Sequence, residues 1–204
     1  GVYGAAESQD FYVLFYRKDI LANLGLSVPD TWDDVKAMMP VLLRYGMNFF
    51  MPLSGGAGYK GFALTSPFIY QNGSGYVTDD GTASLFDTDN FIDAMQEMTD
   101  LYKIYGMSTS LPSFYHSFRS GEVPIGIATF GTYLQLQVAA PELAGKWGIA
   151  LTPGTKQEDG TILRYQPATS NTCMILENTQ KSEEAWSFLK WWLSTDVQTR
   201  YAYL

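Results

Sequence analysis

The segment Phe11-Tyr12-Val13-Leu14-Phe15-Tyr16 decides the fold class, because it is a run of aromatic and branched apolar residues without alternating polar positions. A strand with one face in water alternates apolar and polar side chains, whereas a strand covered on both faces is apolar throughout. The segment therefore predicts a strand buried on both faces, in a sheet with helices on each side.

Helix and strand signals alternate outward from this strand. Residues 17–24 predict a short helix closed by Gly25, and a capping box from Thr31 to Asp34 predicts a helix over 32–43. Pro40 is expected to bend or end that helix near 36–39. Further helices are expected over 89–105, capped by Thr88 or Asp87, and over 113–120, 131–140 and 182–193, the last capped by Ser182.

The remaining segments complete an α/β pattern. Strands are expected over 48–53, 122–130 and 147–151, a small hairpin over 76–82, and a connection without its own element over 152–164. This alternation predicts an α/β fold with a mixed sheet flanked by helices. The chain begins with Gly1 and enters the first strand almost at once, so we expect it to be a piece of a longer protein.

Composition excludes several classes of function. The chain has 204 residues and a formal net charge of -8, so it would repel the phosphates of nucleic acids and anionic lipid headgroups. The single cysteine, Cys173, and the single histidine, His116, exclude a disulfide and a zinc site of the Cys/His type. We therefore expect neither a metal nor another cofactor.

Motifs for catalysis are weak, although they leave an enzyme open as an alternative. Three carboxylate pairs could serve a glycosidase, but each also suits a helix start or a turn: Asp33 with Asp34, Asp79 with Asp80, and Asp87 with Asp89. Residues 56–61 match the dinucleotide motif G-x-G-x-x-G, but they do not follow the first strand of a βαβ unit. Cys173, in an apolar run, is expected to be an inert, buried thiol rather than a nucleophile.

Aromatic residues make up 15% of the chain, with 14 tyrosines among them. A tyrosine has an apolar ring and a polar tip, which suits a wet cleft that stacks on a ligand and also forms hydrogen bonds with it. The composition therefore suits a ligand-binding cleft, although many of the tyrosines are expected to be ordinary residues at the boundary of the core.

Several blocks then identify a family. Residues 15–21, 24–26 and 28–35, FYRKDIL, LGL and VPDTWDDV, resemble a signature of bacterial extracellular solute-binding proteins of the maltose-binding-protein-like, sugar-binding type. Further blocks agree in order and spacing: residues 67–73, 118–123, 131–133, 146–150 and 181–194. The resemblance extends over nearly the whole chain, from about Tyr3 to Leu204.

The resemblance implies a lobe of the type II periplasmic-binding-protein fold and about half of such a protein. It places a C-terminal-lobe-like domain at 10–151, a crossing or hinge segment at 152–176, and at 177–204 a helix that normally packs on the other lobe. It implies a substrate-binding component of an ABC importer, with permease subunits as partners and no enzymatic activity. It further implies a location outside the cytoplasm, either periplasmic or at the cell surface through a lipid anchor.

By the same resemblance, the ligand-binding side chains of this lobe lie at three places. They are Tyr70, Gln71 and Asn72; Gly131, Thr132 and Tyr133; and Tyr165, Gln166, Thr169, Ser170 and Asn171. The family more often carries Trp where this chain has Tyr133. The expected ligand is a sugar or oligosaccharide. Two alternative functions stay open: a carbohydrate-active enzyme that uses paired carboxylates, and a scaffold lobe that binds no ligand.

Overall fold

The computed structural model describes residues 4–51 and 59–203. The chain divides into a larger unit, residues 11–167, and a smaller unit made of residues 1–10 and 168–204. The expected crossing segment, 152–176, is thus divided between the two units after Pro167. The G-x-G-x-x-G motif at 56–61 lies largely outside the described residues.

A mixed sheet forms the centre of the larger unit. Among the described residues its strands follow the order β2-β3-β1-β4, and their bounds are β1 Ala5–Arg17, β2 Phe49–Phe50, β3 Ile125–Thr129 and β4 Trp147–Ala150. Strand β1 is antiparallel to β3 and to β4, whereas β2 is parallel to β3. The predicted α/β class and mixed sheet are confirmed, and β2 is a shorter strand than predicted.

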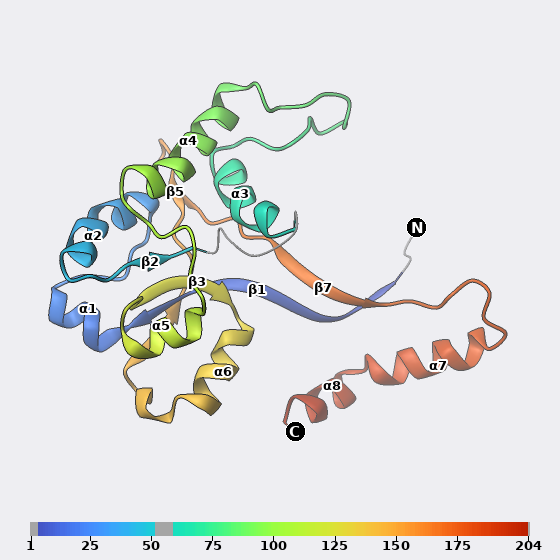
Figure 1. The fold of residues 1–204 in the computed structure, drawn as a ribbon. Coiled ribbons are helices and arrows are strands. Elements are labelled where there is room, and N and C mark those ends of the chain that lie inside the picture. The colour runs from blue at the N-terminus through green and yellow to red at the C-terminus, as the bar shows by residue number, and fades with distance from the viewer. Residues whose placement is uncertain (1–3, 52–58, 204) are drawn as a thin grey trace. The chain divides into compact units, whose positions relative to one another are not determined.

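Helices cover both faces of this sheet (Figure 1). They are α1 Lys18–Leu24, α2 Trp32–Arg44, α3 Tyr59–Gln71, α4 Asp89–Lys103, α5 Phe114–Ser120, α6 Gly131–Ala139 and a 3₁₀ turn, η1, at Pro141–Leu143. Leu14 of β1 packs in a core cluster with residues of α2, α3 and α4. Its neighbours Val13 and Phe15 point to the other face, into a cluster with α5 and α6.

Burial on both faces explains why the decisive segment has no polar alternation. Val13, Leu14 and Phe15 are all buried, although successive side chains of a strand point to opposite faces. The predicted strand is confirmed, and it extends further toward the N-terminus than its apolar run.

Local signals set the ends of the first helices. Gly25 adopts a φ of 66°, in the left-handed region, and closes α1 as predicted. The capping box of α2 is present, since the Thr31 hydroxyl accepts from the Asp34 amide and the Asp34 carboxylate accepts from the Thr31 amide. The helix predicted over 32–43 is confirmed. Of the bend or end expected near 36–39, the end is wrong, because α2 continues through Pro40 to Arg44. Burial of Val35, Met39 and Leu42 stabilises the helix against the loss of one backbone hydrogen bond.

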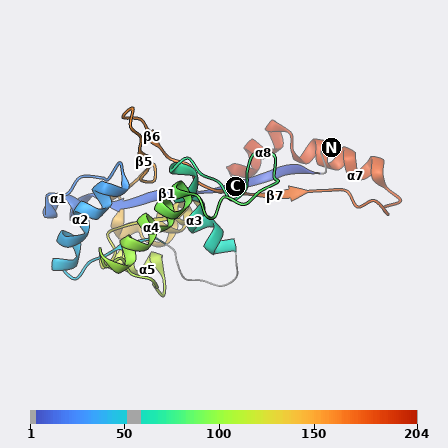
Figure 2. The same cartoon turned by 90° about the horizontal axis from the view of Figure 1, so that it is seen from above.

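Residues 152–164 also differ from the prediction. Two short antiparallel strands, β5 Thr155–Lys156 and β6 Ile162–Leu163, form a hairpin here (Figure 2). The chain enters it through Gly154, where an added Cβ would collide with the carbonyl oxygen of Leu163. The connection therefore has a structure of its own, held by main-chain hydrogen bonds. The hairpin expected at 76–82 is confirmed only as a turn, with one isolated bridge between Val77 and Ser84.

The smaller unit contains β7 Ala168–Cys173, α7 Ser182–Trp192 and α8 Thr195–Ala202. Strand β7 pairs with β1, and the Asn171 side chain donates to the Ser8 hydroxyl at 3.0 Å. The expected cap at Ser182 is wrong, because the helix begins at that residue and Lys181 precedes it without a capping hydrogen bond. Over the described ranges, no helix has the length and apolar character needed to cross a membrane.

Candidate ligand-binding site

The C-terminal end of α3 presents the first group of predicted site residues. Phe68 and Ile69 are buried, and Gly73, with a φ of 71°, turns the chain directly after the helix. The ring of Tyr70 therefore projects from the surface and is 41% exposed. One residue of the helix end is thus available to a ligand, while its neighbours hold the helix to the core.

Tyr70 belongs to a group of three tyrosines. Its ring centroid lies 6.3 Å from that of Tyr165 and 6.1 Å from that of Tyr76. Tyr165, which follows β6, is 55% exposed. The Tyr76 hydroxyl hydrogen-bonds to Thr65 at 2.9 Å and so fixes the ring that supports Tyr70. We call these three rings the tyrosine group; its exposed members, Tyr70 and Tyr165, offer ring faces and hydroxyls together.

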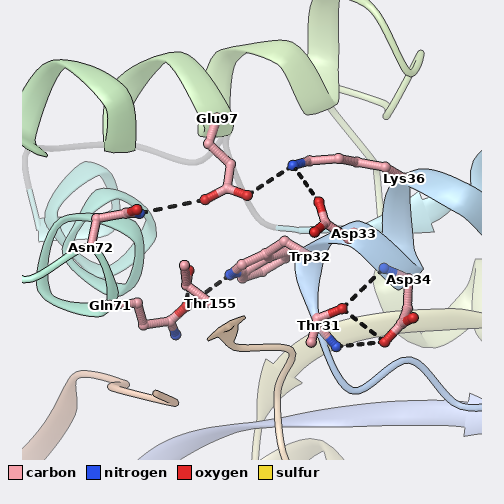
Figure 3. Close-up of polar contacts among 9 residues, drawn as sticks. All are labelled: Thr31, Trp32, Asp33, Asp34, Lys36, Gln71, Asn72, Glu97 and Thr155. Carbon is pink, nitrogen blue, oxygen red and sulfur yellow. Dashed lines mark hydrogen bonds and ion pairs between the residues drawn. The ribbon is translucent and has the colours of Figure 1, made fainter. Parts of the chain in front are cut away.

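Gln71 does not join this surface, because its side chain is fully buried. Its Oε1 accepts from the Trp32 indole Nε1 at 2.8 Å and from the Thr155 hydroxyl at 3.2 Å (Figure 3). Its Nε2 donates to the Tyr165 carbonyl oxygen at 3.1 Å. The amide is thus used inside the protein, next to the exposed tyrosines.

Asn72 is half-buried and takes part in a second polar network. Its Nδ2 donates to the Phe68 carbonyl at 2.9 Å and lies 3.4 Å from Glu97, which pairs with Lys36 at 2.8 Å (Figure 3). Burial alone would lower the pKa of Lys36, but its hydrogen bonds to Glu97 and Asp33 raise that pKa above its usual value. Lys36 is therefore a permanent cation that links α2 to α4.

The start of α6 holds the second predicted group, Gly131, Thr132 and Tyr133. The Tyr133 ring stacks on Phe130 with centroids 5.4 Å apart and meets Trp147 edge-on at the same separation. Phe130 in turn stacks on Phe11 at 5.3 Å. A hollow of about 270 Å³ adjoins this row of rings and is lined by Tyr133, Gln137 and Trp147, among others.

The remaining predicted residues lie on two different segments. Gln166 is half-buried at a narrow apolar crevice beside Tyr12 and Trp32. Thr169, Ser170 and Asn171 lie on β7 of the smaller unit, where Ser170 and Asn171 are exposed. The tyrosine group, Gln166 and the residues at the start of α6 therefore all belong to the larger unit. The three residues on β7 belong to the smaller unit.

Two carboxylates of these pairs, Asp34 and Asp80, lack the raised pKa of a catalytic acid. Burial would raise the pKa of Asp34, but hydrogen bonds from the Thr31 side chain and from main-chain amides hold that pKa below its usual value. Hydrogen bonds from Thr78 and Thr82 lower the pKa of Asp80 to about 2. A general acid needs a raised pKa, so both carboxylates are structural anions.

Cys173 is half-buried, not fully buried as expected, because it lies near the end of the short strand β7. Burial, together with the neighbouring Glu7 carboxylate, raises the pKa of the Cys173 thiol, so this cysteine is not an activated nucleophile. In the part of the chain that the structure describes, no three His, Cys, Asp or Glu side chains gather as a metal site would require.

Comparison with known proteins supplies the family. A family model described as "Bacterial extracellular solute-binding protein" matches residues 2–199. The chain belongs to this family. It is a family of binding proteins, not of enzymes, and it is extracellular or periplasmic. None of the curated proteins compared with the sequence matches it.

Solved structures show the type II periplasmic-binding-protein fold for this chain. The sugar-binding protein MalE from Xanthomonas citri matches with a TM-score of 0.77 and 21% sequence identity. The match covers 100% of this chain and 51% of that one. The GacH receptor of Streptomyces glaucescens, solved unliganded and with acarbose, gives 0.77 and 19% over 97% and 50%. A solute-binding protein from Thermotoga lettingae, bound with alpha-D-tagatose, gives 0.73 and 21% over 98% and 52%.

The chain therefore spans about half the length of the solved solute-binding proteins that it matches. The set of site residues predicted from the sequence did not include three aromatic residues whose rings contact the predicted ones or extend their row: Phe11, Tyr76 and Phe130. Phe11 meets Phe130 because the Phe130 amide donates to the Phe11 carbonyl at 2.9 Å, beyond the end of the β1–β3 ladder. That contact depends on strand register, which no local sequence signal gives.

Proposed function

We propose that the chain is part of the substrate-binding component of an ABC importer and captures a sugar or oligosaccharide. The observation that carries this proposal is the exposed tyrosine pair Tyr70 and Tyr165, with ring centroids 6.3 Å apart. The CH faces of sugar rings pack against aromatic faces, and phenol hydroxyls hydrogen-bond to sugar hydroxyls. Family membership and the tagatose-, maltose- and acarbose-bound structures of similar fold support it.

The ligand-contacting residues divide by chemistry. Tyr70, Tyr133 and Tyr165 provide ring surfaces, and Gly131, without a side chain, leaves the main chain open at the start of α6. Asn72, Thr132 and Gln166 are the polar side chains of the larger unit that we propose for hydrogen bonds to a ligand. Thr169, Ser170 and Asn171 are those proposed on β7 of the smaller unit. Gln71 is left out of this set, because its amide is buried and bonded to Trp32, Thr155 and Tyr165.

The surroundings of this site form the second part of the proposal. Residues 152–176 cross between two lobes, and 177–204 pack on a second lobe whose closure traps the ligand. The exposed rings of α7, including Trp186 and Trp191, support such a contact. Binding needs no cofactor, the partners are permease subunits, and the protein works in the periplasm or at the cell surface on a lipid anchor.

A scaffold lobe that has lost its ligand would bury its tyrosines in packing. Tyr70 and Tyr165 are instead exposed, as binding requires. An enzyme is disfavoured because the family is one of binding proteins, and because hydrogen bonds hold the pKa values of Asp34 and Asp80 below their usual value.

Titration of the whole protein that carries this chain tests the proposal. Maltose, D-tagatose and D-mannitol are added, with heat of binding and thermal shift as readouts; a ligand at 100 times its Kd stabilises by about 2.7 kcal/mol. We expect one of them to bind, and expect Tyr70→Ala or Tyr133→Ala to weaken that binding. Tyr45→Ala, which removes an exposed ring at the end of α2, is the control. Binding of none of these sugars, or equal effects of Tyr45→Ala, would overturn the proposal.

A further inference from the structure

Gln71 has an unusual place among the predicted site residues. It is the last residue of α3, between the exposed Tyr70 and the half-buried Asn72, yet no part of its side chain reaches solvent. Each of its polar side-chain atoms has a partner inside the larger unit, namely Trp32, Thr155 and Tyr165. A residue with these contacts acts on a ligand only through its neighbours.

The partners of Gln71 fix the orientation of its amide. An indole N–H can only donate and a main-chain carbonyl can only accept, so the amide oxygen faces Trp32 and the amide nitrogen faces Tyr165. Glutamate has the same shape and could accept from Trp32, but its carboxylate has no hydrogen for the Tyr165 carbonyl. Methionine has a similar length and could make neither bond. The position thus requires both halves of an amide.

The partner on one side of Gln71 is itself rigidly held. Trp32 is 1% exposed and stacks on Phe68 with centroids 4.4 Å apart. Its main-chain amide donates to the Gly154 carbonyl at 3.1 Å, at the entrance to the β5–β6 hairpin. Trp32 therefore gives Gln71 a fixed anchor at the start of α2 (Figure 3).

The partners on the other side belong to that hairpin and its exit. Thr155 of β5 donates to the Gln71 Oε1, and Gln157 donates to the Gln71 main-chain carbonyl at 3.0 Å. Tyr165 follows β6 by two residues and accepts from the Gln71 Nε2. Gln71 is thus the point at which the hairpin is joined to the end of α3, where Tyr70 lies.

We propose that Gln71 is a positioning residue that fixes the main chain at Tyr165 and so sets the spacing of the Tyr70–Tyr165 pair. The inference rests on the proposed function, because that pair is the surface proposed to bind the sugar. It assigns Gln71 no contact with the ligand. Its effect on affinity passes through the position of the Tyr165 ring.

The test combines a ligand-free and a ligand-bound readout in the whole protein that carries this chain. 3-Fluorotyrosine at position 165 reports the ring's surroundings by ¹⁹F NMR, and calorimetry gives the Kd for maltose, D-tagatose and D-mannitol. Gln71→Met removes both kinds of hydrogen bond, and Gln71→Glu removes only the donor to Tyr165. Gln96→Met, at an exposed position on α4, is the control for the same change of residue type.

Both Gln71 variants are expected to shift or broaden the fluorine signal. Gln71→Glu, which loses the one hydrogen bond to Tyr165, is expected to weaken binding roughly tenfold, and Gln71→Met, which loses all three, by at least as much. The Gln96 variant is expected to change neither. Thr155→Val removes one donor to Gln71 but retains the hydrogen bond from Gln71 to Tyr165. It is expected to change the fluorine signal and the affinity in the same direction as the Gln71 variants, by a smaller amount. This variant keeps the test valid if the Gln71 variants do not fold.

Two results would overturn the inference. One is an unchanged fluorine signal in folded Gln71→Met and Thr155→Val; the other is a loss of affinity without a change in that signal. If the signal moves but none of the three sugars binds the parent protein, the positioning of Tyr165 stands and the proposed sugar-binding function fails.

Discussion

Helix α4 of the larger unit and helix α7 of the smaller unit carry the same kind of apolar stripe but differ in what covers it. In α4 the side chains of Ala94, Met98 and Leu101 are buried. In α7, residues 182–192, which are all described, include no buried side chain, and Trp186 and Trp191 are 49% and 56% exposed. The stripe that completes a core in one unit is thus only half-buried in the other, where Ala185, Leu189 and Trp192 keep part of their surface in solvent.

This difference shows that helical periodicity identifies the apolar face of a helix, but not which part of the protein packs against that face. Aromatic rings in the smaller unit contact one another, such as Phe188 with Trp192 and Trp192 with Tyr201, but they retain exposed surface. Clustered exposed apolar side chains commonly mark interaction surfaces. The proposed second lobe would provide that cover.

The largest expected difference between the units is in the cost of losing a tryptophan. Trp32→Ala in the larger unit should lower the free energy of unfolding by about 3–5 kcal/mol, since it removes a buried ring stacked on Phe68. Trp191→Ala in α7 should change it by less than about 0.5 kcal/mol. Urea unfolding of the 204-residue chain, followed by circular dichroism, measures both. Equal losses would mean that α7 is packed as firmly as the core, and the comparison would fail.

A second difference concerns a buried charge in the larger unit. Arg17 makes a two-point pair with Asp19 at 2.7 and 2.8 Å and donates to the carbonyls of Phe118 and Arg119 at the end of α5. Arg17→Met should lower the free energy of unfolding by about 1–3 kcal/mol, because these oxygens lose their donor. Arg44→Met, at an exposed site on α2, is the control and should have little effect.

The same pair predicts a pH dependence. The hydrogen bond from Arg17 holds the pKa of Asp19 below its usual value. The resulting stability is present above the unfolded pKa, near 4, and is lost as the pH falls through the lower folded pKa. The parent chain should therefore lose more stability than Arg17→Met between about pH 4 and 2. Parallel acid titrations that coincide for the two proteins would contradict this assignment.

The sequence predicts the parts of the fold that depend on local patterns. The apolar run at Phe11–Tyr16, the capping box at Thr31 and the glycine closure at Gly25 are recognised from residue types a few positions apart. Of the bend or end expected near 36–39, the end is wrong because tertiary burial of α2 outweighs the hydrogen bond that Pro40 removes. Helix α8 was not predicted, since its short, polar sequence carries no strong apolar stripe.

The candidate site is less accessible to local reasoning. The sequence places Gln71 beside an exposed tyrosine, but its burial depends on Trp32 and Thr155, which are 39 and 84 positions away. The ring row from Phe11 through Phe130 to Tyr133 likewise requires the strand register. Exposed residues such as Tyr70 could be predicted as binding candidates, whereas the residues that position them could not.

A smaller difference between the units lies in how their helices begin. Thr31→Ala should cost about 1 kcal/mol, because the Thr31 hydroxyl accepts from the Asp34 amide at the start of α2. Ser182→Ala should cost almost nothing, because Ser182 is already within α7 and does not cap it. Urea unfolding of the two alanine variants compares the ends directly. A cost for Ser182→Ala as large as for Thr31→Ala would restore Ser182 as the cap.

The smallest effect is expected at the ion pair between Asp196 and Arg200, one helical turn apart on α8 at 3.3 Å. Both side chains are well exposed, so water and salt screen their attraction. Arg200→Ala should change the free energy of unfolding by less than about 0.5 kcal/mol, and the change should vanish in 1 M salt. Urea unfolding at low and high salt measures it, with Thr199→Ala as the exposed control on the same helix. A larger, salt-independent loss would mean that α8 has a buried contact, so that the smaller unit holds its helices by packing as the larger unit does.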